Sequence, residues 1–425
     1  MKITNLHIEK YKHLENLEFD FTYQSGKKKG QPLEKICFIG QSATGKTNLL
    51  EFIFNELSST FKHLKPSKFD PFYNLSPILK EDDSNKFKIT FLSKDNHKHI
   101  ISDNNFESEI LSIFKDIEDD LEDFSLFLKS NIISDENINI LASNPIELIE
   151  KYPGLSDESF ENILKRNNTI SFDSRENENY WLVIILNILK YRKKFSQKMS
   201  ELINKGLIAD TNRLKREYDK WELENPNPLK KLSEKLNPLL EKLNLEVDYI
   251  NTEYSIPIKR KLTDETIPIQ NTSTGTKGLL LSFLPLFYFR EKASMILIDE
   301  PERSLYPDMQ IDLMDHYRNI APNSQFIVAT HSPFIAAAFE PDERFILYFD
   351  SEGNVKVKRG SSPIGDDPND ILYKDFGLET LLNKTGQEIY DDYLKKKQEV
   401  LFEENPEKKE NLQKEIEKIG DKYDF

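Results

Sequence analysis

The pattern of hydrophobic and polar positions predicts a sheet domain that is interrupted once. Two alternating segments open the chain, and in "NLEFDF" the residues Leu17, Phe19 and Phe21 share one face. After Lys35, "KICFIG" is apolar on both faces, which is typical of a strand buried on both faces. The strand pattern returns with "ASMILID", "SQFIVAT" and "ERFILYF", separated by helical stretches. We therefore predict an α/β fold with a mixed sheet and flanking helices.

The stretch between these two parts is long, charged and helix-favouring. We predict a helical insertion at 102–264, between an N-terminal lobe at 1–101 and a C-terminal lobe at 265–375, with a helical tail at 376–425. Prolines are expected to break or bound the helices of the insertion. They are Pro145, Pro153, Pro226, Pro228 and Pro238. A compact helical lobe is therefore expected in place of a long coiled-coil arm.

Charge is distributed unevenly along the insertion. Residues 103–161 hold 16 acidic residues and three lysines, a net charge of −13, whereas residues 190–220 hold ten basic and four acidic residues, a net charge of +6. Both segments are interpreted either as solvated helix faces or, for the basic one, as a contact with a nucleic-acid backbone or an acidic partner. Its candidate contact residues are Arg192, Lys193 and Lys194. The net charge of −15 opposes a broad nucleic-acid-coating surface.

Composition excludes some other classes of protein. The longest apolar run, "WLVIILNIL", is shorter than the roughly 18–20 residues that span a bilayer. No basic-then-apolar leader follows Met1, so a cytoplasmic protein without a membrane partner is expected. The single cysteine, Cys37, excludes a disulfide scaffold and a cysteine-based zinc site, and we expect it to fill a strand.

"GQSATGKT" matches the phosphate-loop pattern G-x4-G-K-[ST] and stands between an apolar strand and the helical "NLLEFIFNEL". Glycines let successive backbone N–H groups approach phosphates at a helix N-terminus. The lysine adds a charge near the β- and γ-phosphates, and the following hydroxyl binds Mg²⁺. ATP and Mg²⁺ are therefore the expected cofactors. The expected nucleotide-binding residues are Gly40, Gln41, Ser42, Ala43, Thr44, Gly45, Lys46, Thr47 and Asn48.

Two further strands end in polar residues. "MILIDEPE" places Asp299 at a strand tip, where with Thr47 it would hold Mg²⁺, and Glu300 beside it is the expected general base. "FIVATHSPF" ends similarly, so His331 is expected at the same sheet edge, within reach of a γ-phosphate. Glu300 and His331 are the catalytic candidates.

"STGTK", far downstream of the phosphate loop, resembles the signature motif of ABC-type ATPases of the SMC, RecF and OLD group. "GKTNLLE", "DEPERSLYP" and "THSPF" are similar to the same group. The resemblance implies a phosphate-loop head that pairs head-to-tail, as a dimer or a higher homo-oligomer. Each signature would then cap the γ-phosphate held by the partner. The residues acting in trans would be Ser273, Thr274, Gly275, Thr276 and Lys277.

The chain departs from that family in two respects, and the first is Thr274, which occupies the second signature position where many relatives carry glycine. Second, the family places a glutamine after the strand that follows the phosphate-loop helix, and none occurs between Leu49 and Lys190. Either another residue provides the coupling between the metal and the lid that this glutamine provides in the family, or that coupling is weakened.

The chain also resembles the nuclease-free ATPase subunits of anti-phage systems of the Septu, PARIS and retron-associated kinds. "DPNDILYKDFGL" is similar to a segment near their C-termini, although its "PNDIL" is interpreted as a capped helix start. The resemblance implies slow, partner-regulated ATP hydrolysis and a separate effector such as a nuclease, with nucleic acid as a possible ligand. The alternatives are the ATP-binding subunit of a membrane transporter, a RecF-like clamp ATPase of DNA repair, and a nucleotide-gated scaffold with negligible turnover.

Overall fold

The computed structural model describes residues 1–64, 86–92, 98–102, 124–144, 148, 168–174, 178–251, 253–291 and 293–425. The prolines Pro145 and Pro153 and most of the acidic segment 103–161 lie outside these residues.

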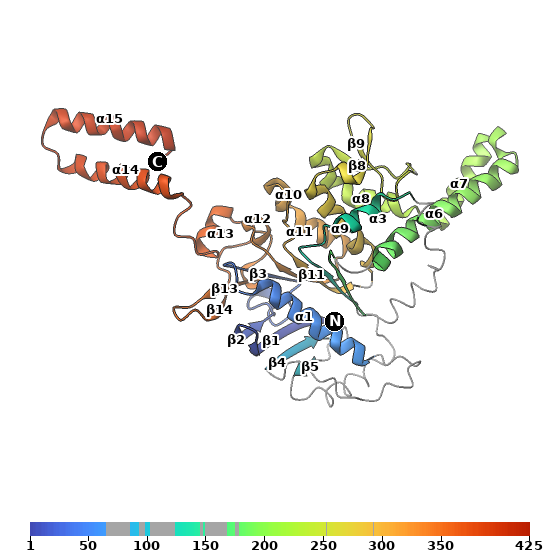
Figure 1. The fold of residues 1–425 in the computed structure, drawn as a ribbon, viewed down its shortest axis with the longest axis horizontal. Coiled ribbons are helices and arrows are strands. Elements are labelled where there is room, and N and C mark those ends of the chain that lie inside the picture. Colours follow the sequence, from blue (N-terminus) through green and yellow to red (C-terminus); the bar gives the residue numbers. More distant parts are fainter. Residues whose placement is uncertain are drawn as a thin grey trace.

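A seven-stranded sheet forms the centre of the molecule (Figure 1). Its strand order is β14-β13-β3-β12-β11-β6-β7, and all neighbours are parallel except the edge strand β14, which runs antiparallel to β13. The expected mixed sheet is thereby confirmed. The strands are β3 (Lys35–Gly40), β6 (Phe124–Leu128), β7 (Thr169–Phe172), β11 (Ala293–Asp299), β12 (Gln325–Ala329), β13 (Arg344–Phe349) and β14 (Val355–Arg359).

The two faces of this sheet bury separate hydrophobic cores. In β11, Met295 and Leu297 belong to one core and Ile296 and Ile298 to the other, as expected when successive side chains point to opposite faces. All six residues of β3 are buried, which confirms the prediction of a central strand. Cys37 is a buried residue of this strand, and burial raises the pKa of its thiol.

One face packs against helix α1 (Lys46–Leu64) and a second, four-stranded sheet of order β2-β1-β4-β5. These strands are β1 (Lys2–Tyr11), β2 (Leu14–Asp20), β4 (Lys86–Leu92) and β5 (Lys98–Ser102), all antiparallel to their neighbours. Phe19 and Phe21 form edge-to-face contacts with Phe38 of β3, at centroid distances of 5.7 and 6.1 Å. The face shared by Leu17, Phe19 and Phe21, as predicted for "NLEFDF", is therefore the buried face of β2 and of the residue that follows it.

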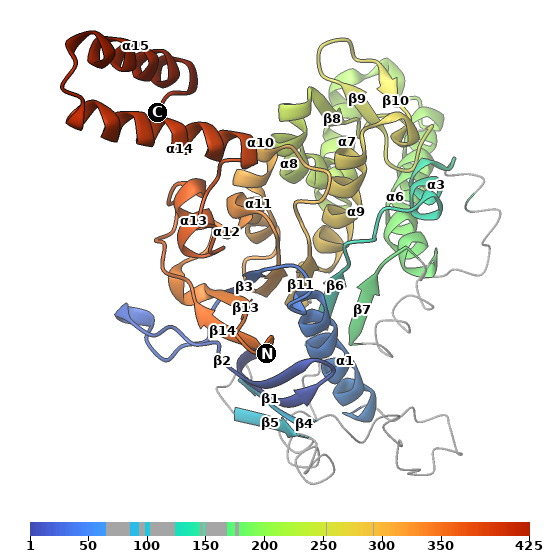
Figure 2. The ribbon, with the colours of Figure 1, turned by 60° about the vertical axis from the view of Figure 1, so that its left-hand side comes forward.

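The other face is covered by helices (Figure 2). They are α3 (Asp135–Ala142), α6 (Glu178–Asn204), α8 (Pro228–Leu240), α9 (Thr274–Phe289), α11 (Leu313–Ile320) and α12 (Pro333–Ala336). Helices α10 (Pro307–Ile311) and α7 (Thr211–Glu224) lie beside them, and α6 and α7 project from the body (Figure 1). A small sheet of β8 (Leu245–Val247), β9 (Ile258–Arg260) and β10 (Thr266–Ile267) completes this layer.

The segment predicted as a helical insertion differs from the prediction, because it contributes β6 and β7 to the central sheet and β8 and β9 to the small sheet. The run "FSLFL" is short and wholly buried, and β11 pairs with it, so tertiary pairing overrides the charged surroundings. Pro226 lies between α7 and α8, and Pro228 is at the start of α8, as expected. Pro238 is an exception, since α8 continues through it to Leu240.

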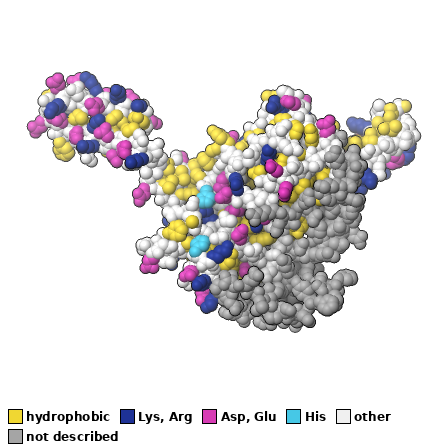
Figure 3. Space-filling view, in the orientation of Figure 1, with side chains coloured by type: hydrophobic (Ala, Val, Ile, Leu, Met, Phe, Trp, Pro, Cys, Tyr) yellow, Lys and Arg dark blue, Asp and Glu magenta, His cyan; other side chains and the backbone are white. Residues whose placement is uncertain are grey.

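The C-terminal part leaves the body as α13 (Pro368–Lys374) and a hairpin of α14 (Lys384–Phe402) and α15 (Pro406–Tyr423) (Figure 1). Asp367 caps α13 by accepting from the Asn369 N–H at 2.7 Å, which confirms the interpretation of "PNDIL" as a helix start. Acidic, basic and hydrophobic side chains are interspersed over the hairpin (Figure 3). Among the described helices, none is both long enough and apolar enough to cross a membrane.

Candidate nucleotide site

The loop of residues 40–45 connects β3 to α1 through backbone conformations that most side chains avoid. Gly40 has φ +136°, Ala43 +66° and Gly45 +90°. A Cβ atom on Gly40 would lie 1.9 Å from the Leu347 carbonyl oxygen of β13, so only glycine fits between the two parallel strands. The loop therefore turns tightly at the carboxyl end of β3 and delivers its N–H groups to the start of α1.

Lys46, the first residue of α1, lies over this loop. Its ammonium group donates to the carbonyl oxygens of Gly40 and Gln41, each at 2.9 Å, and the residue is buried. Burial lowers the pKa of Lys46 to about 8, and the carboxylates of Asp299, Glu300 and Glu302 oppose this shift. A cation is thus held in the concave side of the loop, facing the acidic end of β11.

Thr47 and Asp299 are in contact although 252 residues separate them in the sequence. The Thr47 hydroxyl lies 3.1 Å from both carboxylate oxygens of Asp299. Burial raises the pKa of Asp299 to about 6, with a smaller contribution from Glu300, while hydrogen bonds from Thr47 and Ser130 act in the opposite direction.

This pair of oxygen donors fits Mg²⁺, which binds proteins through one or two hard oxygen ligands and completes its shell with water and phosphate. Asp299 is a desolvated carboxylate whose ionised form lacks a neighbouring cation able to stabilise it fully, as its raised pKa indicates. Within the described residues, no cluster of three or more His, Cys, Asp or Glu side chains is placed to hold a metal. The two residues expected to bind the metal, Thr47 and Asp299, are in contact with each other at the carboxyl ends of the strands.

Glu300 follows β11 in a strained conformation. Its φ of +50° is unusual for a residue with a side chain, and its N–H donates to the Ala329 carbonyl of β12 at 2.9 Å. Strain of this kind persists only where the surrounding structure enforces it, and it is common at functional sites. Here the turn directs the chain out of the sheet at the edge that carries Lys46.

His331 follows β12 at the same edge. Its backbone N–H donates to a Glu302 carboxylate oxygen at 2.7 Å, and its side chain is exposed to solvent on one side. Partial burial and the charge of Lys46 lower the pKa of His331, and Glu300 opposes this effect. The lowered pKa favours the neutral ring, which can donate one hydrogen bond.

The signature residues cap α9. The Ser273 hydroxyl accepts from the Thr276 N–H at 3.2 Å, and Ser273 and Thr274 are exposed at the helix start. Gly275 is packed against the loop after β11, because a Cβ there would lie 2.6 Å from the Ser304 carbonyl oxygen. In the part of the chain that the structure describes, no hydrogen bond or ion pair joins residues 273–277 to residues 40–48.

A model of the AAA ATPase domain family matches residues 1–336. The chain belongs to this family.

Other similarities are more distant. An uncharacterized protein of Methanocaldococcus jannaschii is 26% identical over 128 residues, which span 28% of this chain and 32% of that relative. The SMC head domain from Thermotoga maritima has a TM-score of 0.39 and 11% identity, and covers 85% of this chain and 100% of its own. A Pyrococcus furiosus Smc head with an extended coiled coil, bound to the C-terminal domain of ScpA, has a TM-score of 0.39 and 17% identity, with 85% and 96% covered.

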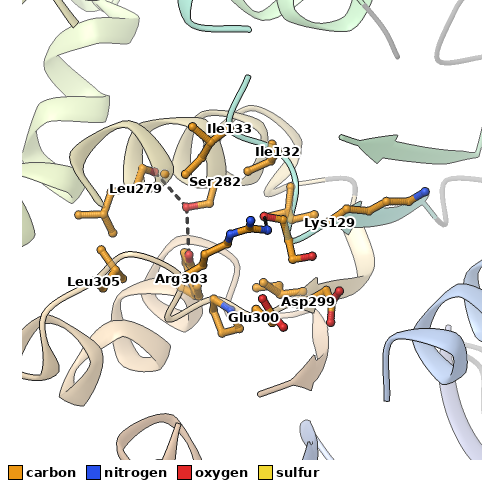
Figure 4. Close-up of a pocket in the computed structure, with 15 residues that line it drawn as sticks. Lys129, Ile132, Ile133, Leu279, Ser282, Asp299, Glu300, Arg303 and Leu305 are labelled. Atoms are coloured by element: carbon orange, nitrogen blue, oxygen red, sulfur yellow. Dashed lines mark hydrogen bonds between the residues drawn. The ribbon is translucent and has the colours of Figure 1, made fainter. Parts of the chain in front are cut away.

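Three residues of this ATPase domain complete the site and were missed by sequence reasoning. They lie around a cavity of about 30 Å³, large enough for water, between the end of β11, the chain after β6 and helix α9 (Figure 4). The residues are Lys129, Ser130 and Arg303. Arg303 donates to the Ser130 carbonyl at 2.7 Å, and the Ser130 hydroxyl bonds Asp299. The segment after β6 thus reaches Asp299, the candidate metal ligand. Its signal was the polar "KS" after "FSLFL".

Glu302 also had no role assigned from the sequence. Burial raises the pKa of its carboxyl, and the His331 N–H donates to it at 2.7 Å. It therefore ties the end of β12 to the loop after β11 and positions His331 relative to Glu300.

The basic residues expected to form a patch behave differently from one another. Arg192 donates to the backbone carbonyls of Tyr254 and Asn251, at 2.8 and 2.9 Å, and burial lowers its pKa to about 10. This guanidinium anchors α6 to the segment before β9, so it is not the surface residue that the sequence suggested. Lys193 and Lys194 on the same helix are exposed.

Proposed function

We propose that this chain binds Mg-ATP at the carboxyl edge of β3, β11 and β12 and hydrolyses it to ADP and phosphate. The observation that carries the proposal is the meeting of Thr47 with Asp299, at 3.1 Å, directly beside the buried Lys46. Membership of the AAA ATPase domain family supports it. Open α/β sheets bind their ligands outside the carboxyl ends of strands, and this edge collects the phosphate loop, two acidic residues and a histidine.

Each residue has a role that its surroundings allow. The N–H groups of residues 40–45 and the Lys46 ammonium would hold the β- and γ-phosphates, with Lys46 exchanging its present carbonyl partners for phosphate oxygens. Thr47 and Asp299 would hold Mg²⁺, which neutralises charge on the phosphates when bound. Asn48, whose amide oxygen accepts from Lys12 at 3.1 Å, lies in the first turn of the same helix.

Glu300 is the proposed general base. It lies at the strand end after Asp299, on a turn that its neighbours hold in place, and it borders a cavity with room for water. A neutral His331 would donate a hydrogen bond to the γ-phosphate as negative charge develops there. Glu302 would act as a positioning residue, since it holds the His331 backbone.

We further propose that two copies pair head-to-tail, as a dimer or within a larger homo-oligomer, with ATP between them. The exposure of Ser273 and Thr274 at the start of α9 supports this, because an exposed helix N-terminus is suited to an anion from outside the chain. Gly275 packs on the loop that begins at Glu300. Binding of a partner's nucleotide at the start of α9 would therefore shift this loop and change the position of Glu300.

The wider role proposed is control of a nucleic-acid-linked process in the cytoplasm, and specifically anti-phage defence with a separate effector such as a nuclease. The support is the resemblance of "DPNDILYKDFGL" to a segment of such ATPase subunits. Hydrolysis would then be slow until the partner is engaged.

The test compares Lys46→Ala with Glu300→Gln. Lys46→Ala should abolish binding of a fluorescent ATP analogue, because it removes the only charge that the loop itself supplies. Glu300→Gln should bind ATP as the wild type does and hydrolyse it about 10²–10⁴-fold more slowly. Equal ATP affinity in Lys46→Ala and wild type would contradict the site, and undiminished hydrolysis by Glu300→Gln would contradict the assigned base.

A further inference from the structure

A second concave site lies at the opposite edge of the central sheet from the candidate nucleotide site. It is a groove of about 780 Å³ between α6, the start of α8 and the end of α9. Residues 290–291 line it just before β11 begins, whereas Asp299 stands where β11 ends. The volume falls within the roughly 300–1,000 Å³ of ligand sites. The groove is therefore distinct from the phosphate loop.

Positive charge is concentrated in this groove. Five cationic side chains and one acidic residue line it: Lys190, Lys193, Lys194, Lys231, Arg290 and Glu291. Glu291 is already engaged with Arg290 at 3.1 Å. Among the described residues, Lys193, Lys194 and Lys231 are exposed and have no carboxylate within ion-pair distance. On a chain of net charge −15, this local surplus can attract an anion that the rest of the surface repels.

Aromatic side chains form part of the same wall. Phe287, Tyr288 and Tyr191 line the groove and are half-buried, so part of each ring system borders the cavity. The Arg290 guanidinium lies 4.3 Å from the centroid of the Phe287 ring. A stacked arginine and aromatic ring form a flat platform on which a planar base can stack. Gln197 and Asn225 add side chains able to donate and accept hydrogen bonds.

We propose that this groove binds a single-stranded nucleic acid. Its lysines would contact the phosphates, and the platform of Arg290 and Phe287 would stack with an unpaired base. A duplex is disfavoured, because its bases are stacked and paired inside the helix and present no free face to this platform. The inference rests on the proposed nucleic-acid-linked role and gives it a site. Helix α9 has 16 residues and is about 24 Å long, with the signature at its first turn and the groove residues 284–289 in its second half.

The experiment measures binding of a fluorescent oligodeoxythymidylate of about 12 nucleotides, within the site sizes of single-strand binders, without ATP or Mg²⁺. Wild type is expected to bind with a dissociation constant of about 1–100 µM at about 50 mM salt. Lys193→Glu/Lys194→Glu should weaken binding at least tenfold. The slope of the logarithm of the binding constant against the logarithm of the salt concentration should be less steep by about 1.4, because each of the two lost phosphate contacts contributes about 0.7. Lys193→Gln/Lys194→Gln, which removes the two charges without reversing them, should also weaken binding, and it serves as the test if the charge-reversed variant does not fold.

The matched control is Lys215→Glu/Lys220→Glu on α7, which makes the same change in charge within the basic segment but outside the groove. It should leave binding within about twofold of wild type. Phe287→Leu keeps the apolar volume and removes the ring, so it should weaken the oligonucleotide by about fivefold or more and leave inorganic polyphosphate unaffected.

Three results would overturn the proposal: no oligonucleotide binding by wild type, an equal loss in the α7 control, or a Phe287→Leu protein that binds the oligonucleotide as wild type does. Because ATP is absent, failure here leaves the ATPase assignment standing. Conversely, unaltered hydrolysis by Glu300→Gln would contradict the ATPase assignment and would leave the proposal for the groove unaffected.

Discussion

At the scale of single residues, the candidate site combines groups that burial makes unfavourable. Asp299 is 4% exposed, and burial raises its pKa to about 6. The unfolded pKa is 3.8, so ionisation of Asp299 destabilises the folded state progressively from about pH 4 to pH 6, and the whole penalty is present above pH 6. A metal carboxylate must nevertheless be ionised. The site therefore lowers stability in the absence of nucleotide and metal.

This reasoning predicts that Asp299→Asn stabilises the metal-free protein. A shift of about two pH units corresponds to on the order of 3 kcal/mol, so we expect a gain of about 1–3 kcal/mol at pH 7. The gain should vanish near pH 4 and level off above pH 6. Urea unfolding in EDTA across this range measures it, with Asp219→Asn on α7 as a surface control. An Asp299→Asn protein that is less stable than wild type at pH 7, or equally stable at all pH values, would refute the electrostatic account.

The sequence located part of this site, because phosphate loops and strand-end carboxylates have fixed local patterns. The spacing in "GQSATGKT" and the apolar run before Asp299 are properties of short segments. Ser130 and Glu302 have no such pattern. Their roles depend on which strands become neighbours: Ser130 meets Asp299 only because β6 pairs with β11. Arg192 was misjudged for the same reason, since its partners are carbonyls about 60 residues away.

At the scale of elements, strands with long apolar runs were predictable and short ones in charged surroundings were not. β11 and β12 carry continuous β-branched or aliphatic runs, whereas β7 is four residues long, "TISF", within a polar stretch. Such strands are stabilised by their neighbours in the sheet more than by their own composition. The helical hairpin of α14 and α15 was expected as helix, but its pairing around Tyr393 requires the folded chain.

Helix α13 is attached to the sheet by a buried ion pair. Arg344 of β13 lies 3.0 Å from Asp375, and both side chains are fully buried. The Ser361 N–H and hydroxyl donate to the same carboxylate at 2.9 Å, and Arg344 also donates to the carbonyls of Ala336 and Ser362. Asp375, the last of the three aspartates in "DPNDILYKDFGL", therefore pairs with a buried arginine of the central sheet.

Asp375→Ala should destabilise the protein by about 3–5 kcal/mol, because it leaves the Arg344 guanidinium buried and uncompensated. Asp370→Ala on the same helix removes an exposed pair with Lys374 and should change stability little. Chemical denaturation of both variants measures the difference. Comparable small effects of the two substitutions would show that the buried pair does not anchor α13.

At the scale of the whole molecule, the arrangement is defined by two candidate binding sites and the C-terminal hairpin. The candidate nucleotide edge lies at the carboxyl ends of the strands, the basic groove lies near the beginning of β11, and α9 runs between the two regions. The hairpin of α14 and α15 stands away from both (Figure 1). A second copy can therefore approach the nucleotide edge without displacing the C-terminal helices.

The central claim is that ATP is shared between two chains, and a cysteine cross-link tests it most directly. Ser42 in the phosphate loop and Ser273 in the signature are both exposed, while the native Cys37 is buried and will not compete. A Ser42→Cys protein is mixed with a tagged Ser273→Cys protein, both carrying Glu300→Gln to retain ATP, and a short thiol cross-linker is added. The account predicts a heterodimeric product that forms with ATP and Mg²⁺ and is absent with ADP or with Lys46→Ala added to the Ser42→Cys chain. A mixture that gives no ATP-dependent product between chains, while each protein binds ATP normally, would contradict it.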